Sequence, residues 1–528
     1  MRITPGIALS SMLTCMLIFS GNVPAATTSR PASAPGTLIY DARIVDGSGD
    51  PARTGAVRIR GERIVEVGAL APQAGETLVD ARGLVLAPGF IDTHNHHDFA
   101  AARPRETIFF DRRESTAALS QGITTVILGM DGFMNYPLRE FFARFQETPA
   151  SVNVASYVGH NVLRERVMGA DNRRPATPAE IGAIRGLIAE EMRAGGLGLS
   201  TGLEYDSGIY SSRAEVIELA REAAAHGGRY ISHIRSEDRH IWEAMDEIIE
   251  IGRAAKLPVQ VTHLKLAMVD LWGQAGKSLS LMDRARAQGI DITADVYPYE
   301  YWRSTLAVLF PDRDFGNRAA AQYALRHVAR PDGLLITTFS PDPKLEDMTV
   351  AEIARLRGTD PAATLMALVA ESRGPGARES VVATSMDAKD VEELIAWPHS
   401  NISSDGALDD GHPRGMGAYP RLLRIHVRER KTLSLESAIR KMSALGAEHV
   451  GIRDRGRISA GAFADLVLFD PQTVTDHATT KQPQAQSTGI LKVWVNGRLA
   501  FENGRSTAAF SGRVIRRPRA GPVPTVDD

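Results

Sequence analysis

His94 and His96 stand two residues apart at the end of an apolar stretch, residues 84–91. If this stretch is a β-strand, side chains two residues apart project from the same face. Two neutral imidazoles on one face can hold a metal ion. The pair alone is a weak indication, because two polar residues at an exposed strand end produce the same pattern. Its interpretation therefore depends on partners elsewhere in the chain.

Further histidines and carboxylates follow other apolar runs. They are Asp131, His233, His263 and Asp405. In a parallel barrel the C-terminal ends of the strands meet on one side, where the active site lies. We therefore expect all six side chains to converge on one metal centre. The residues alone leave a structural alternative open for Asp131, which can cap a turn before Gly132. For Asp405 the alternative is a buried aspartate in a turn beside Gly406.

The elements that must position these residues alternate between strand-like and helix-like patterns. Strand-like runs occupy residues 89–94, 123–128, 152–158, 198–201, 229–233, 259–263, 292–296 and 401–405. Helical patterns separate them, as in residues 214–225, which Gly227 and Gly228 close. This order predicts an α/β fold, a (β/α)8 TIM-like barrel over residues 86–454.

A long connection interrupts this pattern between the seventh and eighth strands. Residues 301–396 contain two further strand-like runs, 334–339 and 380–385. A connection of this length is unusual unless it carries a function. We predict that residues 301–396 form an inserted subdomain or lid.

The two ends of the chain share a sequence pattern that differs from that of the middle. Residues 37–85 and 455–515 contain short alternating runs joined by glycine turns. Neither end has enough strands for a sheet alone, so we expect the two to form one small β-domain. Residues 516–528 are predicted to be a flexible tail.

The N-terminal residues 1–26 have the pattern of a secretory signal peptide, followed by a flexible linker at residues 27–36. We therefore expect a secreted or periplasmic protein without stable membrane insertion after signal removal. Cys15, the single cysteine, lies inside the apolar run of this signal. We expect no lipoprotein anchoring there, because residues 12–14 lack the small residue that should precede such a cysteine.

The overall composition excludes some classes of function and of metal ligand. The chain has 528 residues, 43% of them hydrophobic and 23% charged, and a formal net charge of −2. A near-neutral chain lacks the basic excess of a nucleic-acid-binding protein. Without a cysteine in the mature chain, any metal must be held by nitrogen and oxygen ligands. The oligomeric state cannot be inferred from the sequence.

Several motifs together resemble the amidohydrolase superfamily, specifically its N-acyl-D-amino-acid deacylase (D-aminoacylase) branch. The matching segments are residues 87–96, 158–161, 200–205, 232–237, 262–265, 295–299, 404–406 and 412–414. The resemblance spans about residues 37–499 and implies a zinc-dependent hydrolase of linear amide bonds. Its small-molecule substrates would be N-acyl-D-amino acids, with dipeptides of D-residues as a further class.

The resemblance also implies roles for individual residues. His94 and His96 match ligands of a more weakly held metal, and His233 and His263 match ligands of a tightly held zinc. Asp405 matches the catalytic aspartate, which would take a proton from water and deliver it to the leaving nitrogen. One or two zinc ions, or other divalent metals, are compatible with this ligand set.

The position of Asp131 departs from the family pattern. The family has a cysteine ligand in a Gly-Asn-Cys-Gly turn after the second strand, whereas this chain has Gly129-Met-Asp-Gly132. Zinc accepts aspartate as well as thiolate, so Asp131 is a candidate third ligand. The substitution leaves the number and identity of the metals open.

The substrate carboxylate would be bound by Lys265, Tyr297 and Ser304, with assistance from Arg414. Ser304 matches the family only after a shift of one residue. From the residue types alone, Lys265 can also be an exposed loop lysine and Tyr297 a core residue.

Two other functions stay open from the sequence. One is a cyclic-amide hydrolase or deaminase of the same superfamily. Cyclic-amide relatives often use a carboxylated lysine, and none stands at the expected fourth strand end, residues 202–205. The other is a non-catalytic periplasmic binding protein.

Overall fold

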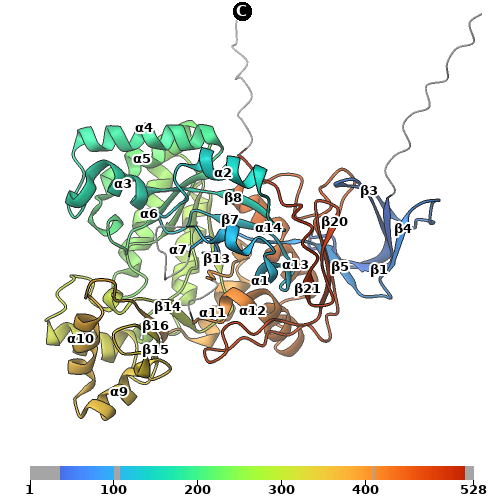
Figure 1. Cartoon of the computed structure of the whole chain (residues 1–528). Helices are drawn as coiled ribbons and strands as arrows, with labels where there is room; N and C mark the ends of the chain where they lie inside the picture. The colour runs from blue at the N-terminus through green and yellow to red at the C-terminus, as the bar shows by residue number, and fades with distance from the viewer. Residues whose placement is uncertain (1–35, 100–106, 408–410, 518–528) are drawn as a thin grey trace, which may run out of the picture. The chain divides into compact units, whose positions relative to one another are not determined.

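The computed structural model describes residues 36–99, 107–407 and 411–517 (Figure 1). The expected signal peptide, the linker up to residue 35 and the tail from residue 518 lie outside the described residues. Within these ranges, no helix is both long enough and apolar enough to span a membrane.

Two parallel sheets contain the strands that the sequence predicts. The first has the order β6 (Phe90–Asp92), β7 (Ile123–Leu128), β8 (Asn153–Ser156). The second consists, in spatial order, of β17 (Ser400–Ile402), β13 (Ile292–Val296), β12 (Val259–Val261), β11 (Arg229–His233), β10 (Gly198–Gly202) and β9 (Val158–Gly159). These strands are almost entirely buried, as expected of parallel strands covered on both faces. The predicted α/β fold is confirmed.

The two sheets adjoin at both ends. Only Tyr157 separates β8 from β9 in the chain, and its N–H donates to Leu128 O at 2.9 Å. On the opposite side, the segments that follow β6 and β17 pair through a parallel bridge between Asn95 and Gly406. The Asp405 N–H donates to His94 O at 2.8 Å, so the residues after these two strands lie side by side.

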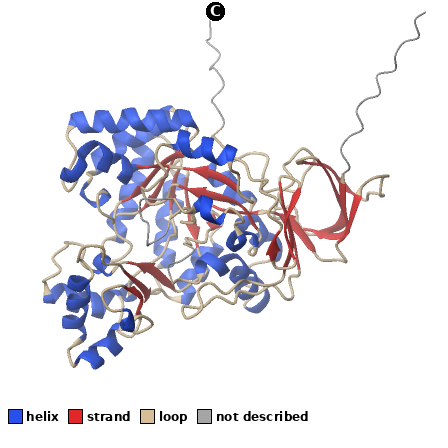
Figure 2. Ribbon diagram, viewed as in Figure 1, coloured by secondary structure: helices blue, strands red, loops and turns tan. Residues whose placement is uncertain are grey.

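Helices flank these strands (Figure 2). They are α1 (Thr116–Leu119), α2 (Leu138–Glu147), α3 (His160–Met168), α4 (Pro178–Ala194), α5 (Arg213–Ala225), α6 (Ile241–Ala255), α7 (Ala275–Ala287), α11 (Ala388–Ala396), α12 (Arg414–Arg421), α13 (Leu435–Met442) and α14 (Ala444–Val450). The side chain of Ser212 caps α5 by accepting from the Glu215 N–H. The chain then turns at Gly227, which has φ +69°. Helix α5 therefore ends where its glycines predict.

A nine-stranded sheet combines strands from both ends of the described chain. It contains β1 (Thr37–Ile44), β2 (Arg53–Arg60), β3 (Arg63–Gly68), β4 (Thr77–Asp80), β5 (Val85–Pro88), β18 (Leu466–Phe469), β19 (Ile490–Val495), β20 (Arg498–Glu502) and β21 (Arg505–Ser506). Strand β5 joins the two ends, since it runs parallel to β1 and antiparallel to β18.

The expected boundary at residue 85 is therefore too early, because β5 belongs to this nine-stranded sheet up to Pro88. The apolar stretch before His94 is two short strands in different sheets, separated at Gly89. A Cβ at Gly89 would lie 2.3 Å from the Thr124 side chain, so glycine permits this close passage.

The C-terminal boundary of the small sheet also differs from the expected residue 515. Val514 forms a parallel bridge with Val154 of β8. The Val154 N–H donates to Arg513 O at 2.9 Å, and the Ile515 N–H donates to Val154 O at 2.7 Å. The segment around residues 513–515 therefore extends a parallel sheet rather than the small one.

Part of the expected insertion has its own sheet and core. Strands β14 (Tyr301–Ser304), β16 (Glu379–Thr384) and β15 (Leu334–Phe339) form an antiparallel sheet in that order. Helices α8 (Arg318–Tyr323), α9 (Val350–Arg357) and α10 (Pro361–Glu371) lie between β14 and β16 in the chain. A separate apolar cluster, which includes Phe310 and Phe339, fills this part.

The expected end of the insertion at residue 396 is too late. Helix α11 (Ala388–Ala396) contacts α7, β13 and β17. Its apolar residues Leu394 and Ile395 belong to the main core. The part with a separate core therefore ends before α11.

Candidate metal centre

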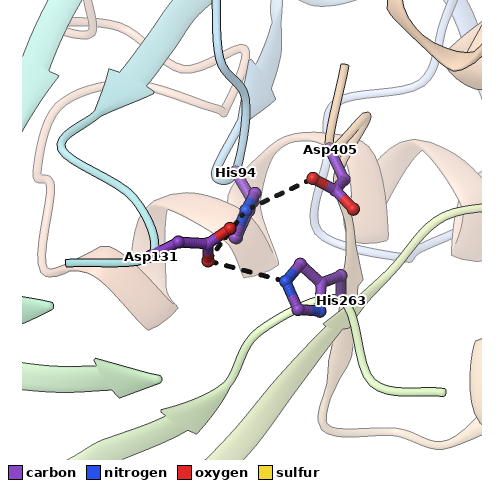
Figure 3. A group of neighbouring side chains, drawn as sticks. All are labelled: His94, Asp131, His263 and Asp405. Atoms are coloured by element: carbon purple, nitrogen blue, oxygen red, sulfur yellow. Dashed lines mark ion pairs between the residues drawn. The ribbon is translucent and has the colours of Figure 1, made fainter. Parts of the chain in front are cut away.

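Four buried side chains meet beyond the C-terminal ends of four parallel strands (Figure 3). Potential ligand atoms of His94, Asp131, His263 and Asp405 all lie within 4.8 Å of one another. Oδ1 of Asp131 lies 3.5 Å from Nε2 of His94 and 3.5 Å from Nε2 of His263. Oδ1 of Asp405 lies 3.5 Å from Nε2 of His94. Residues far apart in the sequence thus face one small volume.

His96 faces the same two carboxylates as His94. Its Nε2 lies 3.4 Å from Oδ2 of Asp131 and 3.3 Å from Oδ1 of Asp405. Both histidines follow β6 rather than lie within it. Their alternation nevertheless directs the two imidazoles to the same place.

His233 lies beside His263, at the same ring nitrogen that faces Asp131. Nδ1 of His233 is 3.0 Å from Nε2 of His263, and a second cluster of possible ligands contains these two residues with Glu237. The six candidate residues are therefore all present at one place.

Three residues of this centre have a backbone conformation that non-glycine residues rarely adopt. The φ angles of Asp131, His263 and Asp405 are +55°, +34° and +48°. Such conformations cost free energy and are found preferentially at functional sites. Hydrogen bonds hold two of them in place: the His263 N–H donates to Asp295 Oδ1 at 2.9 Å, and the Asp405 N–H donates to His94 O.

The geometry does not favour the turn-cap alternative for Asp131. The N–H of Gly132 donates to Ser200 Oγ at 2.8 Å, not to the neighbouring aspartate. Oδ1 of Asp131 and both ring nitrogens of His94 are buried without a hydrogen-bond partner among the described residues. Buried polar atoms nearly always have partners. Imidazole nitrogen and carboxylate oxygen are zinc ligands, so this donor set fits a divalent cation.

A cavity of about 410 Å³ opens above these residues. Asp131, His263 and Asp405 line one part of it. The part with a separate core supplies Trp302, Arg303, Ser304, Thr305, Val308, Leu309 and Val328. The candidate metal-binding residues and a distinct, largely apolar wall therefore share one cavity.

The comparison with known proteins agrees with this geometry. The amidohydrolase family model Amidohydro_3 matches residues 77–330 and 308–501. The chain belongs to the amidohydrolase family. It is 36% identical to the D-aminoacylase of Alcaligenes xylosoxydans xylosoxydans over 508 residues, which cover 92% of this chain and 98% of that protein.

Two other amidohydrolases are similar over nearly the whole chain. The N-acyl-D-glutamate deacylase of Alcaligenes xylosoxydans xylosoxydans is 34% identical, over 90% of this chain and 95% of that protein. The crystal structure of N-acyl-D-glutamate deacylase from Bordetella bronchiseptica matches with a TM-score of 0.80 and 31% identity. That match covers 91% of this chain and 99% of that chain. That protein is complexed with zinc and a phosphonate inhibitor, a mimic of the tetrahedral intermediate of its reaction.

The expected substrate-binding residues of this amidohydrolase lie at or behind the cavity wall. Lys265, Ser304 and Arg414 line the cavity. Tyr297 is 3% exposed and is not among the described lining residues. Its ring centroid lies 4.8 Å from the Arg414 guanidinium carbon and 5.6 Å from Lys265 Nζ. The Tyr297 ring thus packs against the cationic groups of both Lys265 and Arg414.

Charge keeps the carboxylates of the centre ionised. Burial raises the pKa of Asp405, but Arg414 and His263 outweigh it and hold that pKa well below the ordinary range. Burial also raises the pKa of Asp131, and His94 and His263 likewise hold it far below its usual value. Two ionised carboxylates at this depth provide a strong attraction for a cation.

Sequence reasoning missed two carboxylates. Oε2 of Glu204 lies 2.8 Å from Nε2 of His233. Oε1 of Glu237 lies 3.0 Å from Nδ1 of His263 and 2.7 Å from Nζ of Lys265. Both glutamates stand inside motif segments, 200–205 and 232–237, which was the available indication. Glu204 follows β10 by two residues, so the strand-end criterion could have selected it, whereas Glu237 lies four residues beyond β11.

Proposed function

We propose that this chain is a zinc-dependent hydrolase of N-acyl-D-amino acids that releases a carboxylate and the free D-amino acid. The observation that carries the proposal is the convergence of His94, Asp131, His263 and Asp405 on one buried volume beside a cavity. Family membership and the deacylase relatives define the reaction class. Dipeptides with a D-residue on the amine side of the bond are substrates of the same kind.

An amide is a poor electrophile and water is a poor nucleophile. His94, His96, Asp131, His233 and His263 would hold zinc, whose Lewis acidity would lower the pKa of a water molecule to about 7 and polarise a carbonyl. One ion would be held by some of these five side chains, and two ions by more of them.

Asp405 is the general base and then the general acid. Its carboxylate takes one proton from the attacking water, whose oxygen bonds to the acyl carbon. The same proton is delivered to the nitrogen as the C–N bond breaks, so the products are an amine and a carboxylic acid, which then loses its proton to become a carboxylate. The low pKa of Asp405 keeps it ionised, and therefore able to accept the proton, at neutral pH.

The substrate α-carboxylate lies against the cationic wall of the cavity. Lys265 and Arg414 supply the charge, and Ser304 supplies a hydroxyl from the wall formed by the part with a separate core. Tyr297 packs behind both cations and restricts their positions. This arrangement orients the amide toward Asp405.

The finer architecture is part of the proposal. Strands β6, β7, β8 with β9, β10, β11, β12, β13 and β17 form the eight positions of one closed barrel. The hydrogen bond of the Tyr157 N–H and the bridge between Asn95 and Gly406 support the closure. Residues 301 to about 386 are an inserted subdomain, supported by their separate core. The pattern of residues 1–26 supports secretion or a periplasmic location.

The test uses purified full-length protein with measured zinc content. Matched N-acetyl-D- and N-acetyl-L-amino acids are incubated with the zinc-loaded protein, and the free amino acid is quantified by chiral chromatography. We expect hydrolysis of the D-substrates, its loss on zinc removal and its recovery when zinc returns. Equal hydrolysis of both enantiomers, or hydrolysis of neither, would contradict the proposal. Hydantoin hydrolysis without deacylation would favour a cyclic-amide hydrolase.

A further inference from the structure

His233 and His263 are arranged as a pair with matching outer partners. Nδ1 of His233 and Nε2 of His263 face each other at 3.0 Å. On the far side of each ring stands a carboxylate, Glu204 at 2.8 Å from His233 Nε2 and Glu237 at 3.0 Å from His263 Nδ1. The two histidine side chains are only 4% and 2% exposed.

We propose that Glu204 and Glu237 are positioning residues that fix the tautomers of His233 and His263. Each carboxylate accepts a hydrogen bond from the outer ring nitrogen. The inner nitrogens, Nδ1 of one ring and Nε2 of the other, then both present lone pairs to one cation. This inference rests on the proposed function, because it requires a metal ion at the centre.

The position of the single ring proton on each neutral imidazole leads to this arrangement. A neutral imidazole carries one proton, on one of its two nitrogens, and only the other nitrogen can bind a metal. An ionised carboxylate can only accept a hydrogen bond, so it selects the tautomer with the proton on its side. A carboxylate on the outer nitrogen also raises the basicity of a histidine ligand. With both outer positions occupied by glutamates, neither inner nitrogen carries a proton.

Lys265 makes Glu237 especially important. Nζ of Lys265 lies 2.7 Å from Nδ1 of His263, and an ammonium group is only a donor. If Lys265 donated to Nδ1, the imidazole proton would sit on Nε2, where it blocks metal binding. Glu237 opposes this, because it accepts from Lys265 at 2.7 and 2.8 Å and its Oε1 lies 3.0 Å from Nδ1 of His263.

The backbone of Glu204 is held in position by a residue of the part with a separate core. Nη2 of Arg313, which belongs to the part with a separate core, donates to the backbone oxygen of Glu204 at 2.7 Å. The same guanidinium donates to Ala307 O at 3.0 Å. The turn after β10 is therefore tied to the cavity wall, and the Glu204 side chain reaches His233 from a supported backbone.

The experiment measures zinc affinity rather than activity alone. Metal-depleted full-length protein competes with a chromophoric chelator for zinc. The variants are Glu204→Ala, Glu204→Gln, Glu237→Ala and the double variant Glu237→Ala/Lys265→Met. Glu243→Ala is the matched control, because the Glu243 side chain is 70% exposed on α6 and forms an ion pair with His240 rather than with His233 or His263. Near-ultraviolet circular dichroism checks that each variant keeps its tertiary structure.

We expect each single alanine variant to bind zinc about 10- to 100-fold more weakly, as is typical when the outer partner of a histidine ligand is lost. Glu204→Gln should recover much of this affinity, since its amide oxygen still accepts from Nε2. Lys265→Met should restore affinity in the Glu237→Ala background, because it removes the competing donor. The Glu243→Ala control should bind like the wild type.

Three results would overturn the inference. They are wild-type affinity in both single alanine variants, a Glu204→Gln variant no better than Glu204→Ala, and no recovery in the double variant. The second would assign the effect to charge rather than to tautomer selection. A wild type that binds zinc but does not hydrolyse N-acyl-D-amino acids would contradict the proposed function alone. A wild type that binds no zinc would contradict both.

Discussion

Nη1 of Arg414 lies 2.5 Å from Oδ2 of Asp405, and both side chains are buried. The other carboxylate oxygen, Oδ1, lies 3.3 Å from His96 Nε2 and 3.5 Å from His94 Nε2. One oxygen is thus anchored by a guanidinium while the other is directed at the metal centre. A carboxylate fixed in this way is oriented for proton transfer before substrate binds.

Asp405→Asn should therefore abolish most turnover without releasing the metal. Asparagine tolerates the φ of +48° at this position and keeps the shape of the side chain, but it cannot accept the proton. We expect kcat to fall by about 10²- to 10⁴-fold. Steady-state kinetics and metal analysis of the same preparation check this. A variant with wild-type kcat would remove Asp405 from the role of general base.

Asp131 should control metal affinity and selectivity. Asp131→Asn retains a residue that tolerates φ +55° but removes the charge shared with His94 and His263, so zinc affinity should fall. Asp131→Cys should keep zinc and favour softer ions such as Cd²⁺, because a thiolate is a softer ligand. Chelator competition with Zn²⁺, Mn²⁺ and Cd²⁺ measures both effects. Unchanged selectivity in Asp131→Cys would show that Asp131 does not contact the metal.

Lys265→Met should weaken substrate binding. The loss of a charge-assisted contact to the α-carboxylate costs about 1.5–3 kcal/mol, which corresponds to a fall in kcat/KM of about 10- to 150-fold. Because this contact is made in the ground state as well as the transition state, most of the effect should appear in KM. Lys389→Met, a change at an exposed lysine of α11, is the control. An unchanged KM would place the substrate carboxylate elsewhere.

Lys441 predicts a pH dependence of stability that is unrelated to the metal. Burial lowers its pKa to about 7, while Nζ donates to the backbone oxygens of Trp397 at 2.5 Å and Ser400 at 2.8 Å. The unfolded chain, with a pKa near 10.5, binds this proton more tightly than the folded chain. Stability from this group therefore rises with pH between about 7 and 10, by at most about 1.4 kcal/mol per unit.

The corresponding experiment compares the Tm of the wild type with that of Lys441→Met. The variant cannot bind this proton in either state, and the other titrating groups are common to both proteins. We expect the Tm of the wild type to rise relative to that of the variant from pH 7 to pH 9. A difference in Tm that stays constant over this range would contradict the lowered pKa of Lys441.

Local sequence patterns predict the strands well where glycines stand at the ends of an apolar run. The run 123–128 is predicted and found as β7, between Gly122 and Gly129, which have φ +83° and +79°. The run 292–296 is found as β13 with the same limits. Side-chain alternation also predicted that His94 and His96 point the same way. These properties depend on residues close in the chain, so the sequence alone is sufficient to predict them.

Long-range packing decided what the local pattern left ambiguous. The apolar stretch before His94 divides between two sheets at Gly89, where Thr124 leaves no room for a Cβ, and Val514 pairs with β8 instead of the small sheet. The carboxylate partners of the two strand-end imidazoles, Glu204 and Glu237, come from loops whose conformation depends on distant contacts. The sequence by itself therefore determined which side chains could form a metal centre. Only the tertiary structure decided which nitrogen of each imidazole faces that centre, because this depends on neighbours brought together by folding.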